Sequence, residues 1–256
     1  MEELKVCVVV PTYNNGGTVA DVVARVMAVA PHVVVVVDGS TDDTVSQLDQ
    51  LRRRLPAAQA EGLHVEAYAD NRGKGYALKT GFKHAISQGF EYAITIDSDG
   101  QLQPEEIPLF VEVLKAHPEA FVVGARNLSQ TNMPGGNTFA NKFSNFWFAV
   151  QTWHRLPDTQ TGFRLYPLRL LSGIHFITSR YEAELELLVF AAWSGVQLIP
   201  VPVSVYYPPQ GERVTHFRPV ADFMRITVLN TVLCCLALCY GWPRMLINKL
   251  KRRSHG

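Results

Sequence analysis

Residues 33–43 read VVVVVDGSTDD, and this stretch decides the fold. Five consecutive valines are typical of a β-strand that is buried on both faces, because a strand with one solvent-facing side alternates apolar and polar residues. The Asp, Gly, Ser and Thr residues that follow are typical of the loop after a strand. A strand buried on both faces predicts a parallel sheet with helices on either side.

The segments around this strand alternate between apolar runs and helical spacing of apolar residues. A strand–helix–strand order indicates βαβ units, and so a mostly parallel central sheet with helices on both faces. We expect an α/β domain over residues 1–207 and an amphipathic, interfacial helical extension over residues 208–256. The strands are expected at 6–10, 33–37, 65–69, 92–96 and 121–123, and the helices at 18–29, 44–55, 76–88, 105–116 and 139–153.

Composition limits the classes of function. The chain has 256 residues, of which 47% are hydrophobic and 18% charged, which excludes a disordered, collagen-like or coiled-coil protein. The 24 basic and 23 acidic residues leave a net charge of +1, so there is no overall basic field to attract nucleic acid. The four cysteines lack the spacing of a zinc site or a disulfide framework, which suits a reducing compartment.

The two ends of the chain predict where it works. The N-terminal sequence MEELKVCVVVPTYNN fits a first strand better than a signal peptide, so we expect a cytoplasmic protein. The apolar stretch 226–240 is shorter than the roughly 20 residues of a membrane-spanning helix, which predicts a buried or interfacial helix. The basic residues after it favour peripheral contact with an anionic membrane, although a solvated tail is the alternative. They are Arg244, Lys249, Lys251, Arg252 and Arg253.

Four polar loops follow the expected strands. Because ligands of an open parallel sheet bind at the carboxyl ends of its strands, we expect these loops to build one site. They are PTYNNGG at 11–17, DGSTDDT at 38–44, DNRGKG at 70–75 and DSDGQ at 97–101.

The last of these loops carries two carboxylates, Asp97 and Asp99, with one residue between them. Hard cations such as magnesium or manganese take oxygen ligands of this kind and leave room for phosphate oxygens. A calcium loop does not fit, because its glycine belongs at the sixth position and its glutamate at the twelfth, where this chain has Pro108. The loop therefore predicts a site for a metal and a diphosphate, with helix capping as the remaining alternative.

Other phosphate-binding motifs are missing from the sequence. Neither GxxxxGK[ST] nor a GxGxxG after the first strand occurs, so a P-loop is excluded and a dinucleotide site loses its main support. Arg72-Gly73-Lys74-Gly75 fits two interpretations: a turn into the next helix, or a source of cations for the same diphosphate.

Eight motifs together carry a resemblance to a known family. The succession VVVPTYNN, VVVDGSTDDT, NRGKGYALKTGF, ITIDSDGQ, VVGAR, DTQTGFRLY, YEAELELL and VPVSVYY resembles the family 2 glycosyltransferases with a GT-A fold. It is most similar to the dolichyl- or polyprenyl-phosphate mannose and glucose synthase branch. The resemblance covers about residues 4–207, and the final fifty residues match less clearly.

The resemblance implies an inverting enzyme that uses a nucleotide sugar, such as a UDP- or GDP-sugar, and a divalent metal, magnesium or manganese. Members often have two aspartates before Gly-Ser, and here Val37 takes the first place. The metal ligands implied are Asp97, Asp99 and Gln101. The nucleotide-sugar contacts expected are Pro11, Tyr13, Asn14, Asp38, Gly39, Arg72, Lys74 and Asp97.

The resemblance also implies an acceptor side. Arg126 resembles an arginine that this branch uses near the phosphate, and the segment 158–164 resembles the one that lines the acceptor. The acceptor implied is a lipid, in the first place a polyprenyl phosphate, at the cytoplasmic face of a membrane. The acceptor contacts expected are Arg126, Gly162, Arg164, Arg213, His216 and Arg218.

Charge separates the possible mechanisms. A phosphate acceptor is already an anion and needs cations such as Arg126, whereas a hydroxyl acceptor needs a general base, for which Glu182 and Glu184 are the candidates. The catalytic residues expected are Asp99, Arg126, Glu182 and Glu184. A sugar-phosphate nucleotidyltransferase is an alternative from another class, but its glycine-rich N-terminal signature is replaced here by PTYN at 11–14. A non-catalytic binding module is disfavoured by the intact aspartate pair.

Overall fold

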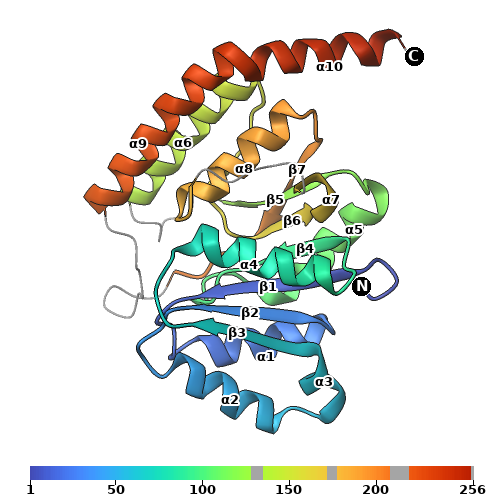
Figure 1. Cartoon of the computed structure of the whole chain (residues 1–256), viewed down its shortest axis with the longest axis vertical. Coiled ribbons are helices and arrows are strands. Elements are labelled where there is room, and N and C mark those ends of the chain that lie inside the picture. Colours follow the sequence, from blue (N-terminus) through green and yellow to red (C-terminus); the bar gives the residue numbers. More distant parts are fainter. Residues whose placement is uncertain (128–134, 172–177, 208–218, 255–256) are drawn as a thin grey trace.

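A computed structural model describes residues 1–127, 135–171, 178–207 and 219–254 of the chain. Its centre is a seven-stranded sheet with the strand order β3-β2-β1-β4-β6-β5-β7 (Figure 1). The paired strands are parallel except for β6, which runs antiparallel to both β4 and β5. The expected α/β class with a mostly parallel sheet is confirmed, although strands β6 and β7 were not among the strands expected at these positions.

Most of the expected elements begin and end within a few residues of the observed ones. The strands are β1 Val6–Thr12, β2 Val33–Asp38, β3 Leu63–Tyr68, β4 Tyr92–Thr95, β5 Phe121–Arg126, β6 Arg164–Pro167 and β7 Leu198–Val203. The helices are α1 Val19–Val29, α2 Thr44–Arg54, α3 Ala57–Gly62, α4 Lys74–Ser87, α5 Ile107–Ala116, α6 Gly135–Thr152, α7 Leu168–Leu171, α8 Glu182–Trp193, α9 Pro219–Leu236 and α10 Trp242–Ser254. A 3-10 turn, Pro104–Glu106, precedes α5, and a π-helical turn, Ala237–Gly241, joins α9 to α10.

The five valines of β2 are buried, as the sequence predicts. Alternate side chains enter two different cores: Val33, Val35 and Val37 pack in one, and Val34 and Val36 in the other. Each core needs apolar side chains from this strand, which explains the unbroken run of valines.

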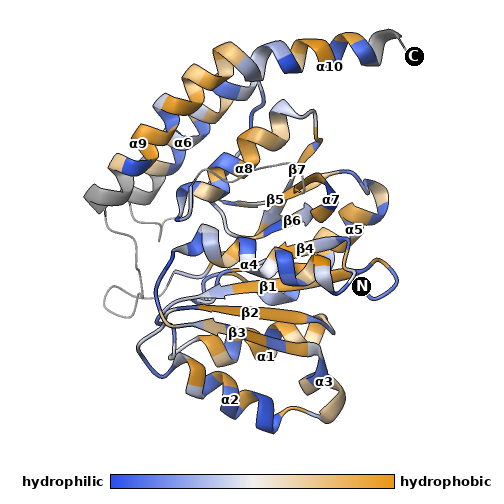
Figure 2. Cartoon of the chain, in the orientation of Figure 1, coloured by the Kyte–Doolittle hydropathy of each residue, from blue (hydrophilic) through white to orange (hydrophobic). Residues whose placement is uncertain are grey.

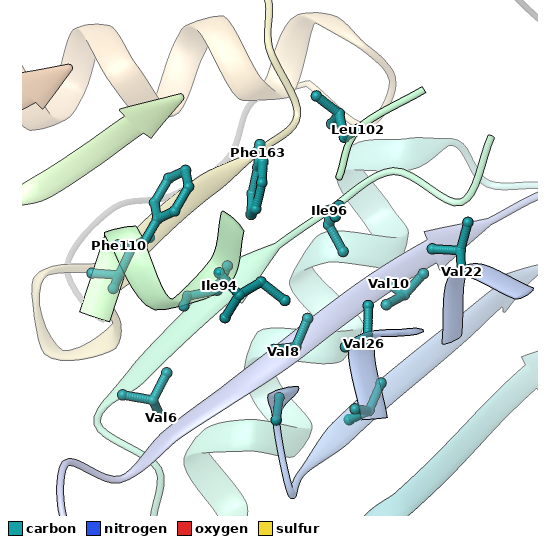
Figure 3. Packing of buried hydrophobic residues seen from close by; sticks show 14 of the residues in the cluster. Val6, Val8, Val10, Val22, Val26, Ile94, Ile96, Leu102, Phe110 and Phe163 are labelled. Carbon is teal, nitrogen blue, oxygen red and sulfur yellow. The ribbon is translucent and has the colours of Figure 1, made fainter. Parts of the chain in front are cut away.

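Helices cover both faces of the sheet. Helices α1, α2 and α5 contribute to the first core, and α4, α6 and α8 to the second. Figure 3 shows the first core, where strand residues such as Val8 and Ile94 lie beside Val26 of α1 and Phe110 of α5. Helix α9 lies alongside α6 as a further layer, and its Leu229 shares the second core (Figure 1).

The C-terminal helix is longer than its apolar stretch suggests. Helix α9, the π-helical turn and α10 follow one another directly, and the 28-residue helix Met224–Lys251 contains an 18-residue stretch with a mean hydropathy of 1.6. By length and composition it could cross a membrane, so the expectation of a segment too short to span is wrong. The helix continues past Pro243 because a widened π-helical turn precedes this residue, which lacks a backbone N–H.

Candidate functional site

The loops after β1, β2 and β4 are tied to one another by hydrogen bonds. The Asn14 side-chain oxygen accepts from the Thr41 backbone N–H at 2.8 Å. The Asn15 side-chain amide donates to Ser98 Oγ at 2.7 Å, and Ser98 Oγ donates to the Pro11 carbonyl at 3.2 Å. These bonds gather the loops at one edge of the sheet, where the sequence places them.

Asp38 holds the loop after β3. Its two carboxylate oxygens accept from the backbone N–H groups of Arg72 and Gly73, both at 2.7 Å, and the residue is 3% exposed. Gly39 lets the two loops meet, because its φ is +68° and a Cβ there would lie 2.3 Å from the Asn71 backbone nitrogen. The observed contact of Asp38 is thus with the 71–73 turn, and its contact with a nucleotide stays a prediction.

Lys74 lies between two carboxylates at the start of α4. Its Nζ is 2.6 Å from Asp97 Oδ1, just after β4, and 2.8 Å from Glu184 Oε2, in the first turn of α8. Burial opposes the Lys74 charge, but Asp97 and Glu184 together raise the pKa of Lys74 above its ordinary value. A charged lysine therefore joins the expected metal loop to the helix that carries the candidate bases.

Asp99 is a weaker acid than an ordinary aspartate. Burial, and after it the charge of Asp97, raise the pKa of Asp99 to about 6. Its Oδ1 accepts the Gln101 backbone N–H at 3.0 Å, so the 99–101 turn holds the carboxylate in place. A buried carboxylate whose ionisation is disfavoured by a neighbouring negative charge gains from a cation beside it.

Gly162 contacts the metal loop directly. Strand β6 pairs with β4, and Thr95 Oγ1 donates to the Gly162 carbonyl at 2.8 Å. A Cβ on Gly162 would lie 2.3 Å from Asp97 Oδ2, so the absence of a side chain lets the backbone approach this carboxylate. Gly162, expected on the acceptor side, therefore lies against Asp97.

Arg126, at the end of β5, is held by a buried carboxylate. Its Nε lies 2.6 Å and its Nη2 3.1 Å from the two oxygens of Asp158, which is fully buried and also accepts from the Asn141 side chain at 2.6 Å. Burial opposes the Asp158 charge, but Arg126 holds the pKa of Asp158 below its usual range. Asp158 thus fixes the Arg126 guanidinium, and the Arg126 side chain as a whole remains 18% exposed.

Arg164 does not have the surroundings expected of it. It is fully buried, and its guanidinium donates to the backbone carbonyls of Thr161, Glu184 and Thr159 at distances from 2.6 to 2.9 Å. The structure therefore contradicts the expectation that Arg164 binds the acceptor, because its donors connect the 159–161 segment to α8. Asp158, from the same motif, reaches the site by holding Arg126, and a pairing across 32 residues leaves no signal in the sequence.

The other expected donor and base residues have different surroundings. Arg72 is exposed, with its guanidinium 4.8 Å from the centre of the Tyr76 ring. Tyr13 and Glu182 are half-buried. The roles expected of these three residues stay predictions.

The remaining expected site residues are the metal ligand Gln101 and three basic acceptor residues. The Gln101 carbonyl accepts the Tyr206 backbone N–H at 2.7 Å, which joins the metal loop to the segment after β7. Three expected acceptor residues lie outside the described part of the chain: Arg213, His216 and Arg218.

The group of charges at this edge suits a divalent cation. Ion pairs link Lys74 and Arg126 to three described carboxylates, and both cations also act on the pKa of a fourth, Asp99. Within this described group, two negative charges are left without a counter-charge when all carboxylates are ionised. The donors near Asp99 are oxygens, which Mg²⁺ and Mn²⁺ prefer. The residues present therefore fit the metal that the sequence implies. The carboxylates are Asp97, Asp99, Asp158 and Glu184, and the cations are Lys74 and Arg126.

Comparisons with known proteins agree with this arrangement. The family model described as glycosyl transferase family 2 matches residues 7–174. The chain is 26% identical over 205 residues to the polyprenol monophosphomannose synthase of Mycolicibacterium smegmatis, a match that covers 77% of this chain and 76% of that protein. It is 25% identical over 217 residues to the undecaprenyl-phosphate mannosyltransferase of Micrococcus luteus, and here the match covers 82% of this chain and 86% of that protein.

Solved structures share the fold. Glucosyl-3-phosphoglycerate synthase from Mycobacterium tuberculosis, in complex with Mn²⁺, uridine diphosphate and phosphoglyceric acid, has a TM-score of 0.63 and 19% identity. The match covers 92% of this chain and 78% of that one. With about two thirds of its length matched by the family model, this chain belongs to glycosyl transferase family 2 and is a glycosyltransferase with a GT-A fold.

Proposed function

We propose that this glycosyltransferase moves a sugar from a nucleotide-sugar donor to a polyprenyl phosphate, with inversion, at the cytoplasmic face of a membrane. One observation carries the choice of acceptor: Arg126, whose side chain is 18% exposed, is fixed by Asp158 within electrostatic reach of the aspartate pair. A fixed arginine next to the donor site is suited to an anionic acceptor, which needs positioning and no general base. Two relatives support the same choice, because one is named as a polyprenol monophosphomannose synthase and the other as an undecaprenyl-phosphate mannosyltransferase.

The donor would lie along the loops after β1 to β4. The hydrogen bonds among these loops hold them in place before the donor arrives, which lowers the entropy lost on binding. Asp97 and Asp99, with Gln101, would hold the divalent metal, which supplies positive charge to the leaving diphosphate when it is bound. Lys74 adds a second cation on the same side, as the sequence interpretation of this loop allows.

The acceptor's lipid would be met by the outer face of the C-terminal helix. Met224, Val228 and Val232 recur at four-residue spacing on α9, and each is 44–59% exposed. Figure 2 shows mostly hydrophobic residues along α9 and a mixture of hydrophobic and hydrophilic ones along α10. Exposed Arg244, Lys249 and Lys251 of α10 would then meet anionic headgroups.

The same helix is bound to the protein on its other side. Leu229 and Leu233 are at most 5% exposed, and the Asn230 side-chain oxygen accepts from the Gln151 side chain at 3.0 Å. A helix with one face in the core and the other apolar and exposed fits a position along the membrane surface better than a crossing one. We therefore propose peripheral contact, and an extension after residue 207 that serves it.

The proposal is tested by a donor and acceptor panel. Purified protein with Mg²⁺ or Mn²⁺ is incubated with UDP- and GDP-sugars, with and without a polyprenyl phosphate, and both nucleotide release and the glycolipid are measured. We expect release with one base only, dependent on the lipid. Arg126→Met should raise the KM for the lipid phosphate, and Arg126→Lys should restore part of the affinity. Transfer that proceeds equally well to a polyprenol without phosphate would contradict the proposal.

A second candidate acceptor, a hydroxyl group, is favoured by one specific observation. Glu184 Oε1 is buried and has no hydrogen-bond partner in the described part of the chain, while Oε2 is held by Lys74. An oriented carboxylate oxygen without a donor is suited to accept a proton from a hydroxyl. Glu184→Gln separates the two acceptors: a loss of about 100-fold or more in transfer indicates a hydroxyl, and a much smaller loss indicates a phosphate. Glu182→Gln tests the other candidate base, the half-buried neighbour on the same turn, in the same way.

A further inference from the structure

Three metal-ligating side chains meet where helix α4 approaches the edge strand β3. His64 and Glu66 are two residues apart, so they point to the same face of the strand. His84 comes from the last turn of α4. One ligand atom from each residue lies within 4.8 Å of the other two, counting imidazole nitrogens and carboxylate oxygens. Two secondary-structure elements thus bring together a cluster that the catalytic site does not use.

Ions can reach the cluster, and its side chains have atoms available to coordinate a metal. His64 is exposed, and Glu66 and His84 are half-buried. Within the described residues the Glu66 side chain takes part in no hydrogen bond or ion pair.

A shared ion requires one of the two imidazole rings to turn, because a metal binds the nitrogen lone pairs in the plane of each ring. The imidazoles stack, with centroids 3.8 Å apart and planes 17° apart. Rotation of the exposed His64 side chain between staggered conformers can turn one of its nitrogens toward an ion that His84 also binds. Because the ligand atoms are already near one another, the backbone can stay in place.

The donor set separates this cluster from the catalytic carboxylates. Imidazole nitrogens suit zinc, cobalt, nickel and copper, whereas the oxygens of Asp97 and Asp99 suit magnesium and manganese. His84 is ten residues beyond Lys74, which places the cluster about 15 Å along α4 from the catalytic site. The two sites would therefore be loaded by different ions and independently.

We propose that His64, Glu66 and His84 form a second metal site, for a divalent ion of the zinc class. Water completes the coordination, because the protein supplies three ligands. The bound ion joins the edge strand to the helix whose first turn carries Lys74, so it stabilises this side of the sheet without taking part in sugar transfer. The site does not depend on the proposed acceptor, because none of its residues belongs to the catalytic group.

Zn²⁺ titration of the full-length protein tests the site. The titration is done by calorimetry in excess Mg²⁺, which occupies the aspartate pair, and with Cys235→Ser and Cys239→Ser, which remove the exposed thiols as competing ligands. We expect one Zn²⁺ per chain, and a Tm that rises with Zn²⁺ concentration. Replacing Zn²⁺ by Co²⁺ should give visible absorption bands without the near-ultraviolet band of a cobalt–thiolate bond.

Matched variants decide the outcome. His64→Gln with His84→Gln should weaken Zn²⁺ binding more than about tenfold and remove the rise in Tm. Glu66→Gln should weaken it less, and His117→Gln, a change in an exposed histidine at the end of α5, should leave it unchanged. Circular dichroism and Mg²⁺-dependent transfer should match the parent in all variants, which separates loss of the site from loss of the fold. Absence of Zn²⁺ binding by the parent, or equal binding by the double-histidine variant, would overturn the proposal.

Discussion

The carboxyl edge of the sheet and the C-terminal helix place their side chains in opposite environments. At the sheet edge, buried polar groups are paired with one another, as in the Arg126–Asp158 and Asn15–Ser98 contacts. Along the C-terminal helix, apolar side chains such as Val228 and Leu238 are 59% and 60% exposed. Fixed polar groups suit chemistry that depends on position, whereas exposed apolar ones indicate a surface made for a less polar medium. The two regions are thus built for different surroundings.

The largest effect on sugar transfer is expected from a substitution of Asp97, at the carboxyl edge of the sheet. Asp97→Asn removes a proposed metal ligand and a partner of Lys74, so we expect sugar transfer to fall at least about 100-fold. Initial rates at saturating donor and metal measure this, with circular dichroism to check the fold. Transfer within a few-fold of the parent would show that this edge does not hold the metal.

The next effect tests the close approach of Gly162, just before β6. Gly162→Ala places a methyl group on the Asp97 carboxylate, which must move, so we expect transfer to fall about 10- to 100-fold. Metal affinity, measured by titration with Mn²⁺, should weaken with it. Gly17→Ala is the matched control, because a Cβ at Gly17 meets no atom within 4 Å. Equal effects of the two changes would remove the special role of Gly162.

A third prediction concerns stability and pH. An unfolded Asp99 loses its proton near pH 4, and the folded one near pH 6, so the folded chain holds this proton more strongly. The protonated Asp99 therefore contributes to the free energy of unfolding below about pH 4, and this contribution is lost as pH rises through about 6. Asp99→Asn should therefore raise the free energy of unfolding of the metal-free protein by about 1–3 kcal/mol at pH 7, and by less at pH 4. Urea denaturation at both pH values measures this. A destabilised variant at pH 7 would contradict the assignment.

The smallest effect tests the helix. Leu238→Ser removes an apolar side chain that is 60% exposed, and we expect binding to anionic vesicles to weaken about fivefold. Sedimentation with vesicles measures the bound fraction. Leu109→Ser, which changes a leucine of α5 that is 46% exposed, is the control and should have no effect. If both changes weaken binding alike, contact with the membrane is not specific to the C-terminal helix.

The site at the sheet edge could be predicted from the sequence, because parallel topology alone brings the ends of successive strands together. The loops at 11–17, 38–44, 70–75 and 97–101 could thus be grouped before any distance was known. Which charged side chains pair with one another could not be predicted from the sequence. Arg164 and Asp158 lie in one short motif, and only the burial of β6 and the approach of α8 decide that the arginine binds backbone carbonyls while the aspartate holds Arg126.

The helix length was missed for a related reason. The sequence Gly241-Trp242-Pro243 follows the apolar stretch, and glycine and proline commonly mark the end of a helix. In the structure Gly241 packs against the Trp193 ring, where a Cβ would lie 2.4 Å from a ring atom. The contact is with a residue 48 positions earlier, so spacing within the helix does not reveal it.

One backbone carbonyl has a consequence for the order of folding. The Gln151 carbonyl accepts the indole N–H of Trp193 at 2.8 Å and that of Trp242 at 3.1 Å. During synthesis the first bond can form as soon as α8 emerges, whereas the second waits until residue 242 has left the ribosome. Trp242→Phe, which deletes the second bond, should therefore raise the fraction of newly made chain that is captured by vesicles added during translation. In the interval between the two bonds, the body of the protein and a membrane compete for the same helix.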